Sequence, residues 1–228
     1  MDQKLQPSPP GLGPLQASSL ADQTSFAIVE GIASGVLKSG QRLVETELAQ
    51  LFQVSRVPLR EALKVLEAQG IVESTRHRGT HVAQFDEARF DQICEARVAL
   101  ERIAITGAAE ACRKDPSFLK RFEAHIETIE RAAQSVDWPR IGRADIAFHR
   151  EFCLAADNPV VLTLWEAIAR NVMIVFGHEA RRERDAAAIG PDHRRLLAML
   201  TTASTPELHD AIEKHIMRLR LRSRATRA

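Results

Sequence analysis

Four polar side chains lie on apolar helical faces in the second half of the chain. Asp145 and His149 are four residues apart in "IGRADIAFHREFCLAA", while His193 lies in "PDHRRLLAML" and His215 in "LHDAIEKHIMRLR". A buried carboxylate or imidazole needs a partner. One oxygen and three nitrogens suit a divalent transition metal, and an aspartate and a histidine one helical turn apart can bind the same ion. We therefore predict a metal site, with Zn first and Ni, Mn or Fe as alternatives.

Taken one at a time, these residues have simpler explanations. Each histidine could be a core residue with a satisfied hydrogen bond, and Asp145 could bond to His149 alone. A metal-dependent hydrolase is a further alternative, but the cluster lacks an evident general base, because Asp145 is used as a ligand and Glu101 is expected to pair with Arg97.

Two further residues are candidates for binding a small molecule. Arg97 lies on the inward face of "CEARVALE", where a guanidinium is costly unless it meets an anion. That anion is either a ligand carboxylate or an internal partner, Glu101 or Asp145. Asn171 shares a predicted inward face with Leu164 and is a weaker candidate. Four protein ligands would leave coordination positions open for a carboxylate if the ion takes five or six ligands.

A second group of chemically useful residues lies near the N-terminus, in "VSRVPLREALKVLEAQG". Arg56, Arg60 and Lys64 recur every four residues and form one cationic line on a helix, and leucines line another face. One face of this helix is expected to be buried and the other to meet an anion.

The elements around this helix predict a winged helix-turn-helix. Two helices, one from Phe26 and one in "ETELAQLFQV", precede it, and Ser55 is a plausible N-cap. Two short strands, "GIVEST" and "THVAQF", follow around "RHRG", where Gly79 allows a tight turn. In such a domain the third helix enters the DNA major groove and the wing lies beside the backbone or the minor groove.

The run "GQRLVETELAQLFQVSRVPLREALKVLEAQGIVE" followed by "RHRGTHV" closely resembles the DNA-binding domain of the GntR family of bacterial transcription regulators. The resemblance implies that Ser55, Arg56 and Arg60 approach DNA, the arginines at a guanine edge and Ser55 at a phosphate. Lys64, farther along the helix, would contact a phosphate or remain solvated, and the wing residues His77, Arg78 and Gly79 would reach the adjacent groove.

The rest of the chain predicts an all-α antiparallel bundle of about six helices, divided by Asp-Pro, Asn-Pro and Gly-Pro punctuation. Within it "DIAFH", "DHRRLL" and "EKHI" resemble the ligand-binding domain of the FadR-type branch of GntR regulators. The resemblance implies that Asp145, His149, His193 and His215 hold a metal and that Arg97 clamps a carboxylate. The domain length is similar to that of the VanR-like subgroup.

Composition bounds the remaining possibilities. The net charge is only +1 over 228 residues, so DNA must be held by a local basic patch. Three scattered cysteines do not complete a disulfide framework, and no apolar run appears long enough to cross a bilayer, which together favour a cytoplasmic protein with no membrane partner. Residues 1–22 are expected to form a flexible arm, 23–84 the DNA-binding domain and 86–222 the metal- and effector-binding domain.

These observations predict a homodimeric transcription regulator, in the first place a repressor, that binds double-stranded DNA at a palindromic operator. A small organic acid bound in the helical domain would change its DNA affinity. In the main alternative the metal itself is the signal, or is purely structural, and no organic effector is needed.

Overall fold

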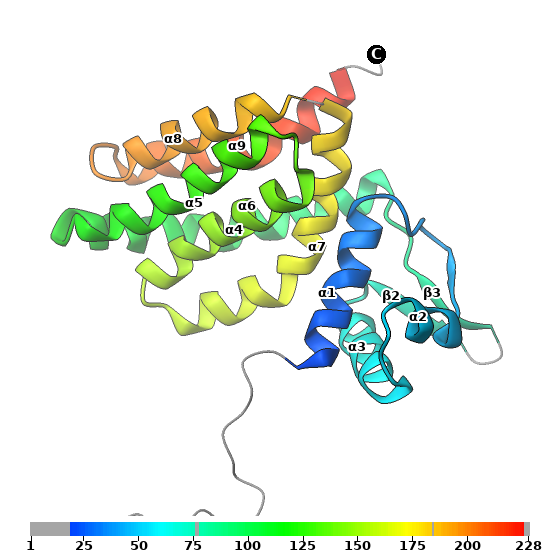
Figure 1. Cartoon of the computed structure of the whole chain (residues 1–228). Helices are drawn as coiled ribbons and strands as arrows, with labels where there is room; N and C mark the ends of the chain where they lie inside the picture. Colours follow the sequence, from blue (N-terminus) through cyan, green and yellow to red (C-terminus); the bar gives the residue numbers. More distant parts are fainter. Residues whose placement is uncertain (1–18, 76–77, 184, 226–228) are drawn as a thin grey trace, which may run out of the picture.

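The structure is a computed structural model that describes residues 19–75, 78–183 and 185–225, apart from the side chains of Glu183, Leu219 and residues 221–225. Its N-terminal part is a winged helix-turn-helix (Figure 1). The elements are α1 (Leu20–Ala33), β1 (Arg42–Leu43), α2 (Glu45–Leu51), α3 (Arg56–Ala68), β2 (Val72–Thr75) and β3 (Gly79–Val82). The three strands form an antiparallel sheet in the order β1-β3-β2.

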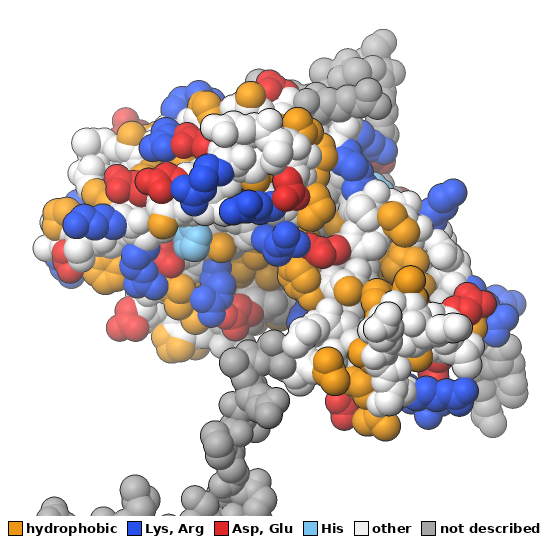
Figure 2. Space-filling model, viewed as in Figure 1, with side chains coloured by type: hydrophobic (Ala, Val, Ile, Leu, Met, Phe, Trp, Pro, Cys, Tyr) orange, Lys and Arg blue, Asp and Glu red, His pale blue; other side chains and the backbone are white. Residues whose placement is uncertain are grey.

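Helix α3 divides into the two faces that its sequence predicts. Leu59, Leu63 and Leu66 are buried, and Arg56, Arg60 and Lys64 are exposed. The buried leucines pack on α1 and α2, so the cationic line faces outward. Figure 2 shows basic side chains at the outer edge of this domain.

The C-terminal part is a helical bundle. Within the described residues it contains α4 (Glu87–Lys114), α5 (Ser117–Gln134), α6 (Trp138–Ala155), α7 (Pro159–Glu183), a 3-10 turn (Ala186–Ala188), α8 (Ile189–Met199) and α9 (Thr205–Ala225). Asp86 caps α4 and Asp137 caps α6, each by accepting a backbone N–H of the first turn. The predicted fold class, a winged helix-turn-helix followed by about six helices, is confirmed.

Three phenylalanines occupy the centre of the bundle. Phe122 of α5 and Phe148 and Phe152 of α6 are fully buried, with ring centroids 5.0 to 5.5 Å apart. Their packing joins α5 to α6 directly beneath the polar cluster described below.

Helix α1 lies between the two halves of the molecule and packs on both α3 and α7 (Figure 1). At its C-terminal end the backbone of α7 comes so close that a Cβ at Gly177 would lie 2.6 Å from the carbonyl oxygen of Ala33. Glycine is therefore needed here for the contact between the two halves.

Several details differ from the sequence predictions. Helix α1 begins at Leu20, within the predicted arm, and α9 continues to Ala225; the predicted domain limits remain predictions. Strand β1 was not predicted. Leu164 of α7 is 50% exposed, although it shares the predicted inward face of Asn171. The core contacts of this helix are made by neighbouring positions.

One helix meets the length and composition criteria for a membrane span, although no apolar run was expected to be that long. The segment Pro159–Arg182 of α7 is long and apolar enough to cross a bilayer. However, α7 packs against α1, α4, α6 and α9, as the core helix of a bundle does. By itself this helix is weak evidence for a membrane segment.

Candidate metal centre and DNA-binding surface

The structure brings the four predicted metal ligands together. Asp145 and His149 come from α6, His193 from α8 and His215 from α9, and one ligand atom of each lies within 4.8 Å of the others. His149 is fully buried, Asp145 and His193 are nearly so, and His215 is half-buried. Three helices thus converge on one polar centre in an otherwise apolar core.

Hydrogen bonds at the outer nitrogens fix two of the imidazole rings. His149 places Nδ1 2.5 Å from Oε2 of Glu101, and an ionised carboxylate can only accept, so Nδ1 carries the hydrogen. His193 donates from Nδ1 to the carbonyl oxygen of Ile189 over 2.8 Å. In the neutral rings, Nε2 of both histidines therefore presents a lone pair to the centre, as it must in a metal ligand.

The lone pairs at the centre face one another. Nε2 of His193 lies 3.0 Å from Oδ1 of Asp145 without forming an aligned hydrogen bond, and the other carboxylate oxygen has no hydrogen-bond partner. Nε2 of His149 lies 3.2 Å from Nε2 of His215, which can donate a hydrogen bond to it when that nitrogen carries the proton. Acceptors packed this closely repel unless a proton or a cation lies between them. The donor set fits a divalent transition metal.

The ionisable groups are held in the forms that bind metals. Burial alone would raise the pKa of Asp145, but its polar surroundings, which include the positive charge of Arg97, bring it below its usual range. Burial lowers the pKa of His149, and burial with the neighbouring histidines lowers that of His215 well below the usual value. Near neutral pH the carboxylate is ionised and these imidazoles are neutral.

Arg97 makes the internal salt bridge that was the alternative to a ligand clamp. Its Nε lies 2.7 Å from Oε1 of Glu101, and its Nη2 lies 3.7 Å from Oδ2 of Asp145. Glu101 also accepts from Nε1 of Trp165 over 3.1 Å. Burial would raise the pKa of Glu101, but Arg97 and His149 lower it to about 2. Nη2 of Arg97 has no hydrogen-bond partner among the described residues.

Sequence reasoning missed what Glu101 does. It was considered only as a partner of Arg97, yet it is the residue that orients His149. Its spacing of four from Arg97 was visible, but no local pattern links it to His149, 48 residues further along the chain.

Asn171 does not lie in this centre. Its side-chain amide donates to the backbone oxygen of Gln69 at the end of α3, so it belongs to the boundary between the two halves of the molecule. Its part in effector binding stays a prediction, because the part of α7 that carries it faces the N-terminal domain and not the polar centre. His125 is also outside the centre and lies 3.9 Å from Glu151.

A pocket of about 260 Å³ reaches the centre from outside at His215. Its basic residues are Arg195, Lys214 and Arg218; both arginines pair with the buried carboxylate of Asp192. None of these four was predicted. An anion in this pocket would lie beside His215, at the edge of the candidate metal centre.

On the DNA-binding side, the predicted residues of α3 are exposed but not equally free. Ser55 occupies the N-cap position without making a side-chain cap bond, so its hydroxyl remains available. Arg56 and Lys64 face solvent. Arg60 pairs with Glu45 of α2, with Nε 2.8 Å from Oε2, and this pairing fixes the direction of its guanidinium.

A further cation, which was not predicted from the sequence, lies beside the wing. Arg78 is exposed, Gly79 has a positive φ of 82°, and the predicted contact His77 lies outside the described residues. Strand β1 pairs with β3 and places Arg42 beside the wing, 3.5 Å from where a Cβ at Gly79 would lie. Arg42 thus extends the basic surface from α3 toward the wing.

Comparisons with known proteins agree with both halves of this description. The family profile described as "Bacterial regulatory proteins, gntR family" matches residues 20–82, and that of the "FCD domain" matches residues 92–218. A Paenarthrobacter nicotinovorans protein named "Probable D-xylose utilization operon transcriptional repressor" is 31% identical over 203 residues, 89% of this chain and 88% of that protein.

Two further relatives are informative. The "Uncharacterized HTH-type transcriptional regulator YcbG" of Bacillus subtilis is 30% identical over 211 residues, 87% of each chain. The solved structure of E. coli McbR/YncC superposes with a TM-score of 0.74 at 19% identity, covering 92% of this chain and all of that one. At that identity the structural match shows a shared fold.

Proposed function

Because the chain belongs to the GntR family of bacterial transcription regulators and contains an FCD domain, we propose that it is a dimeric, cytoplasmic repressor. It binds a palindromic operator through α3 and the wing, and a divalent metal with a small carboxylic acid in its bundle. A repressor role is supported by the name of the Paenarthrobacter relative. The VanR-like subgroup, and Zn before Ni, Mn or Fe, are part of this proposal.

One observation carries the metal assignment. Hydrogen bonds to Glu101 and to the Ile189 carbonyl direct the Nε2 lone pairs of His149 and His193 toward the carboxylate of Asp145. Asp145, His149, His193 and His215 would hold the ion, and its charge would attract a carboxylate.

The effector would approach through the pocket beside His215. Its carboxylate would pass the basic residues Lys214 and Arg218. Nη2 of Arg97, buried and without a hydrogen-bond partner among the described residues, supports the proposed role of Arg97 as carboxylate clamp. The same guanidinium also neutralises Glu101.

Helix α4 links this site to DNA binding. Arg97 and Glu101, near its middle, contact the metal centre, and Arg89, near its start, donates to the backbone oxygen of Gly70 just beyond α3. A ligand that shifts α4 would therefore alter how the recognition helix is held. A coupling of about 1 to 3 kcal/mol is typical of such linkage.

The test is a thermal-shift screen of small carboxylic acids against metal-loaded protein, chelated protein and His215→Ala. His209→Ala is a matched control, because His209 lies on the same helix outside the cluster and bonds to Thr106. An acid at about 100 times its dissociation constant should add roughly 2.7 kcal/mol of stability. We expect this only in metal-loaded wild type and His209→Ala.

Other outcomes identify the alternatives. If metal stabilises the protein, no acid adds to it and chelation alone changes operator binding, the metal is the signal. If chelation changes stability but not operator binding, the metal is structural. Binding to the operator that is unaffected by any acid would refute the effector proposal.

A further inference from the structure

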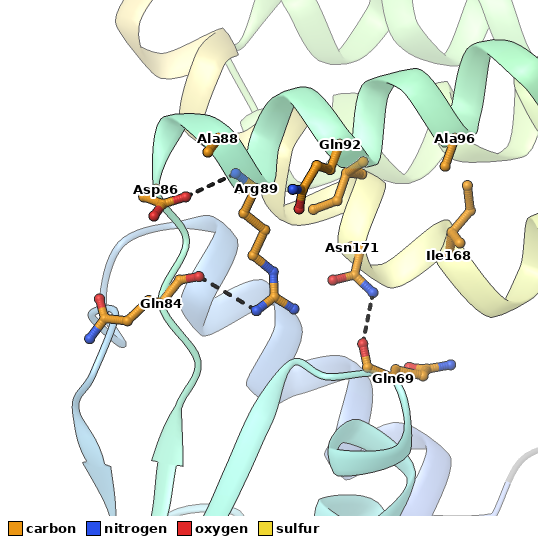
Figure 3. Close-up of a pocket in the computed structure, with 10 residues that line it drawn as sticks. Gln69, Gln84, Asp86, Ala88, Arg89, Gln92, Ala96, Ile168 and Asn171 are labelled. Carbon is orange, nitrogen blue, oxygen red and sulfur yellow. Dashed lines mark hydrogen bonds between the residues drawn. The ribbon is translucent and has the colours of Figure 1, made fainter.

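A second pocket, of about 540 Å³ and open to solvent, lies between the two halves of the molecule (Figure 3). Its size is within the roughly 300 to 1,000 Å³ of small-molecule sites. It is built by the end of α3, the segment before α4, and the facing surfaces of α4 and α7. The lining residues that matter are Gln69, Asp86, Arg89, Gln92, Ile168 and Asn171.

Asn171 supplies an acceptor without a donor. The side chain is 93% buried, and its Nδ2 donates to the backbone oxygen of Gln69 over 3.2 Å. That carbonyl can only accept, so the amide cannot be turned over, and Oδ1 is left without a hydrogen-bond partner among the described residues. Figure 3 shows this oxygen on the side that faces Arg89. A buried acceptor left unpaired is costly, which points to a ligand donor.

Donors stand opposite this oxygen. Arg89 donates to the backbone oxygens of Gly70 and Gln84 and stacks 4.5 Å above the ring of Phe85. In the part of the chain that the structure describes, the hydrogen bonds of its guanidinium go to neutral carbonyls. The exposed amide of Gln92 on the next turn of α4 adds both a donor and an acceptor.

The charges and hydrogen-bonding groups that line the pocket indicate which class of ligand it can bind. Arg89 is countered by the carboxylate of Asp86 at the rim, and the remaining polar lining consists of amides. Hydroxyl groups, which both donate and accept, match such a set, and Ile168 and the neighbouring Ile93 offer an apolar surface for C–H groups. We propose that this pocket binds a neutral polyhydroxylated molecule, such as a sugar or a polyol, at a site separate from the metal centre.

Occupation of this pocket would act directly on the DNA-binding half. Asn171 and Arg89 hold the backbone at the end of α3 through Gln69 and Gly70. A ligand that engages these side chains changes how the recognition helix is held, and DNA must then change the ligand affinity by the same factor.

Isothermal titration calorimetry with xylitol, D-arabinose, D-glucose and the anion D-gluconate tests the proposal on the full chain, with and without a chelator. Gln92→Ala and Asn171→Leu each remove one polar partner, and Gln134→Ala on α5 is a matched control at an exposed glutamine. We expect at least one neutral compound to bind, about tenfold more weakly in both pocket variants. Its affinity should be unchanged in Gln134→Ala and after chelation.

The exposed position of Gln92 keeps the test informative if Asn171→Leu fails to fold, which circular dichroism would reveal. Binding of none of the neutral compounds, or of gluconate alone, would overturn the proposal. So would affinity that is unchanged in Gln92→Ala. Affinity lost on chelation would assign the ligand to the metal centre instead, whereas failure of the acid screen leaves this pocket unaffected.

Discussion

Replacing Glu101 by glutamine should weaken metal binding although Glu101 is not a ligand. The wild-type carboxylate accepts from His149 at one oxygen and from Arg97 and Trp165 at the other. An amide keeps only one oxygen. If that oxygen faces Arg97 and Trp165, the NH₂ group faces Nδ1 of His149 and drives the proton to Nε2, where it blocks the metal.

The size of the effect of Glu101→Gln can be given for both stability and metal affinity. The fall of the Glu101 pKa from 4.5 to about 2 corresponds to about 3 kcal/mol of stabilisation of the ionised form. Loss of that charge beside the buried Arg97 should lower the free energy of unfolding by about 3 kcal/mol, consistent with the cost of breaking a buried ion pair. Metal affinity should fall by about 10- to 100-fold, as for other residues that orient a ligand.

Competition with a chromophoric chelator measures the affinity, and chemical denaturation of the chelated proteins measures stability separately. Glu166→Gln is the control, because Glu166 pairs with Arg150 at the surface and its side chain is 47% exposed. Its cost should be within about 1 kcal/mol. If folded Glu101→Gln binds metal as tightly as wild type, the argument that Glu101 sets the tautomer of His149 is refuted.

Four further substitutions test other parts of the structure. An operator is first selected from random sequences with the wild-type protein. On it, Arg56→Ala should cost about 1 to 3 kcal/mol of binding free energy and relax the base preference in a repeated selection. Lys64→Ala should weaken binding to all sequences alike and reduce the slope of affinity against salt concentration by about one. Gly177→Ala should push α1 away from α7, because the added Cβ would meet the Ala33 carbonyl, and should lower the free energy of unfolding by about 1 to 3 kcal/mol. An unchanged midpoint of chemical denaturation would contradict the close approach of the two helices. Arg220→Ala should cost about 3 to 5 kcal/mol of unfolding free energy, since Arg220 bridges buried Glu179 to the start of α4; a loss below 1 kcal/mol would contradict this.

The sequence was sufficient wherever periodicity and spacing carry the information. The leucines of α3 and the four polar residues of the candidate metal centre lie on helical faces that are readable from the chain; the leucines are buried and the four polar residues lie close together. Helix faces are set by local geometry, so burial of one residue constrains its neighbours three and four positions away.

Contacts between distant elements were not readable in this way. The two-residue strand β1 exists because β3 pairs with it, and its sequence has no strand pattern of its own. Asn171 lies on a predicted inward face of α7. The sequence of α7 does not show that this helix turns from the bundle core to the DNA-binding half along its length. Glu101 becomes the partner of His149 only because α4 packs against α6, which neither helix shows in its own sequence.

The seam between α1 and α7 also bears on how such regulators diversify. At Gly177 of α7 the nearest neighbours are the backbone and the small Cβ of Ala33, so the fit depends mainly on the positions of the two main chains. A chimera that joins this DNA-binding half to a bundle from another regulator would need a glycine at the same place and the same helix spacing. We therefore expect α1 and α7 to be inherited together when family members recombine, because a change of only one of the two helices would break this contact.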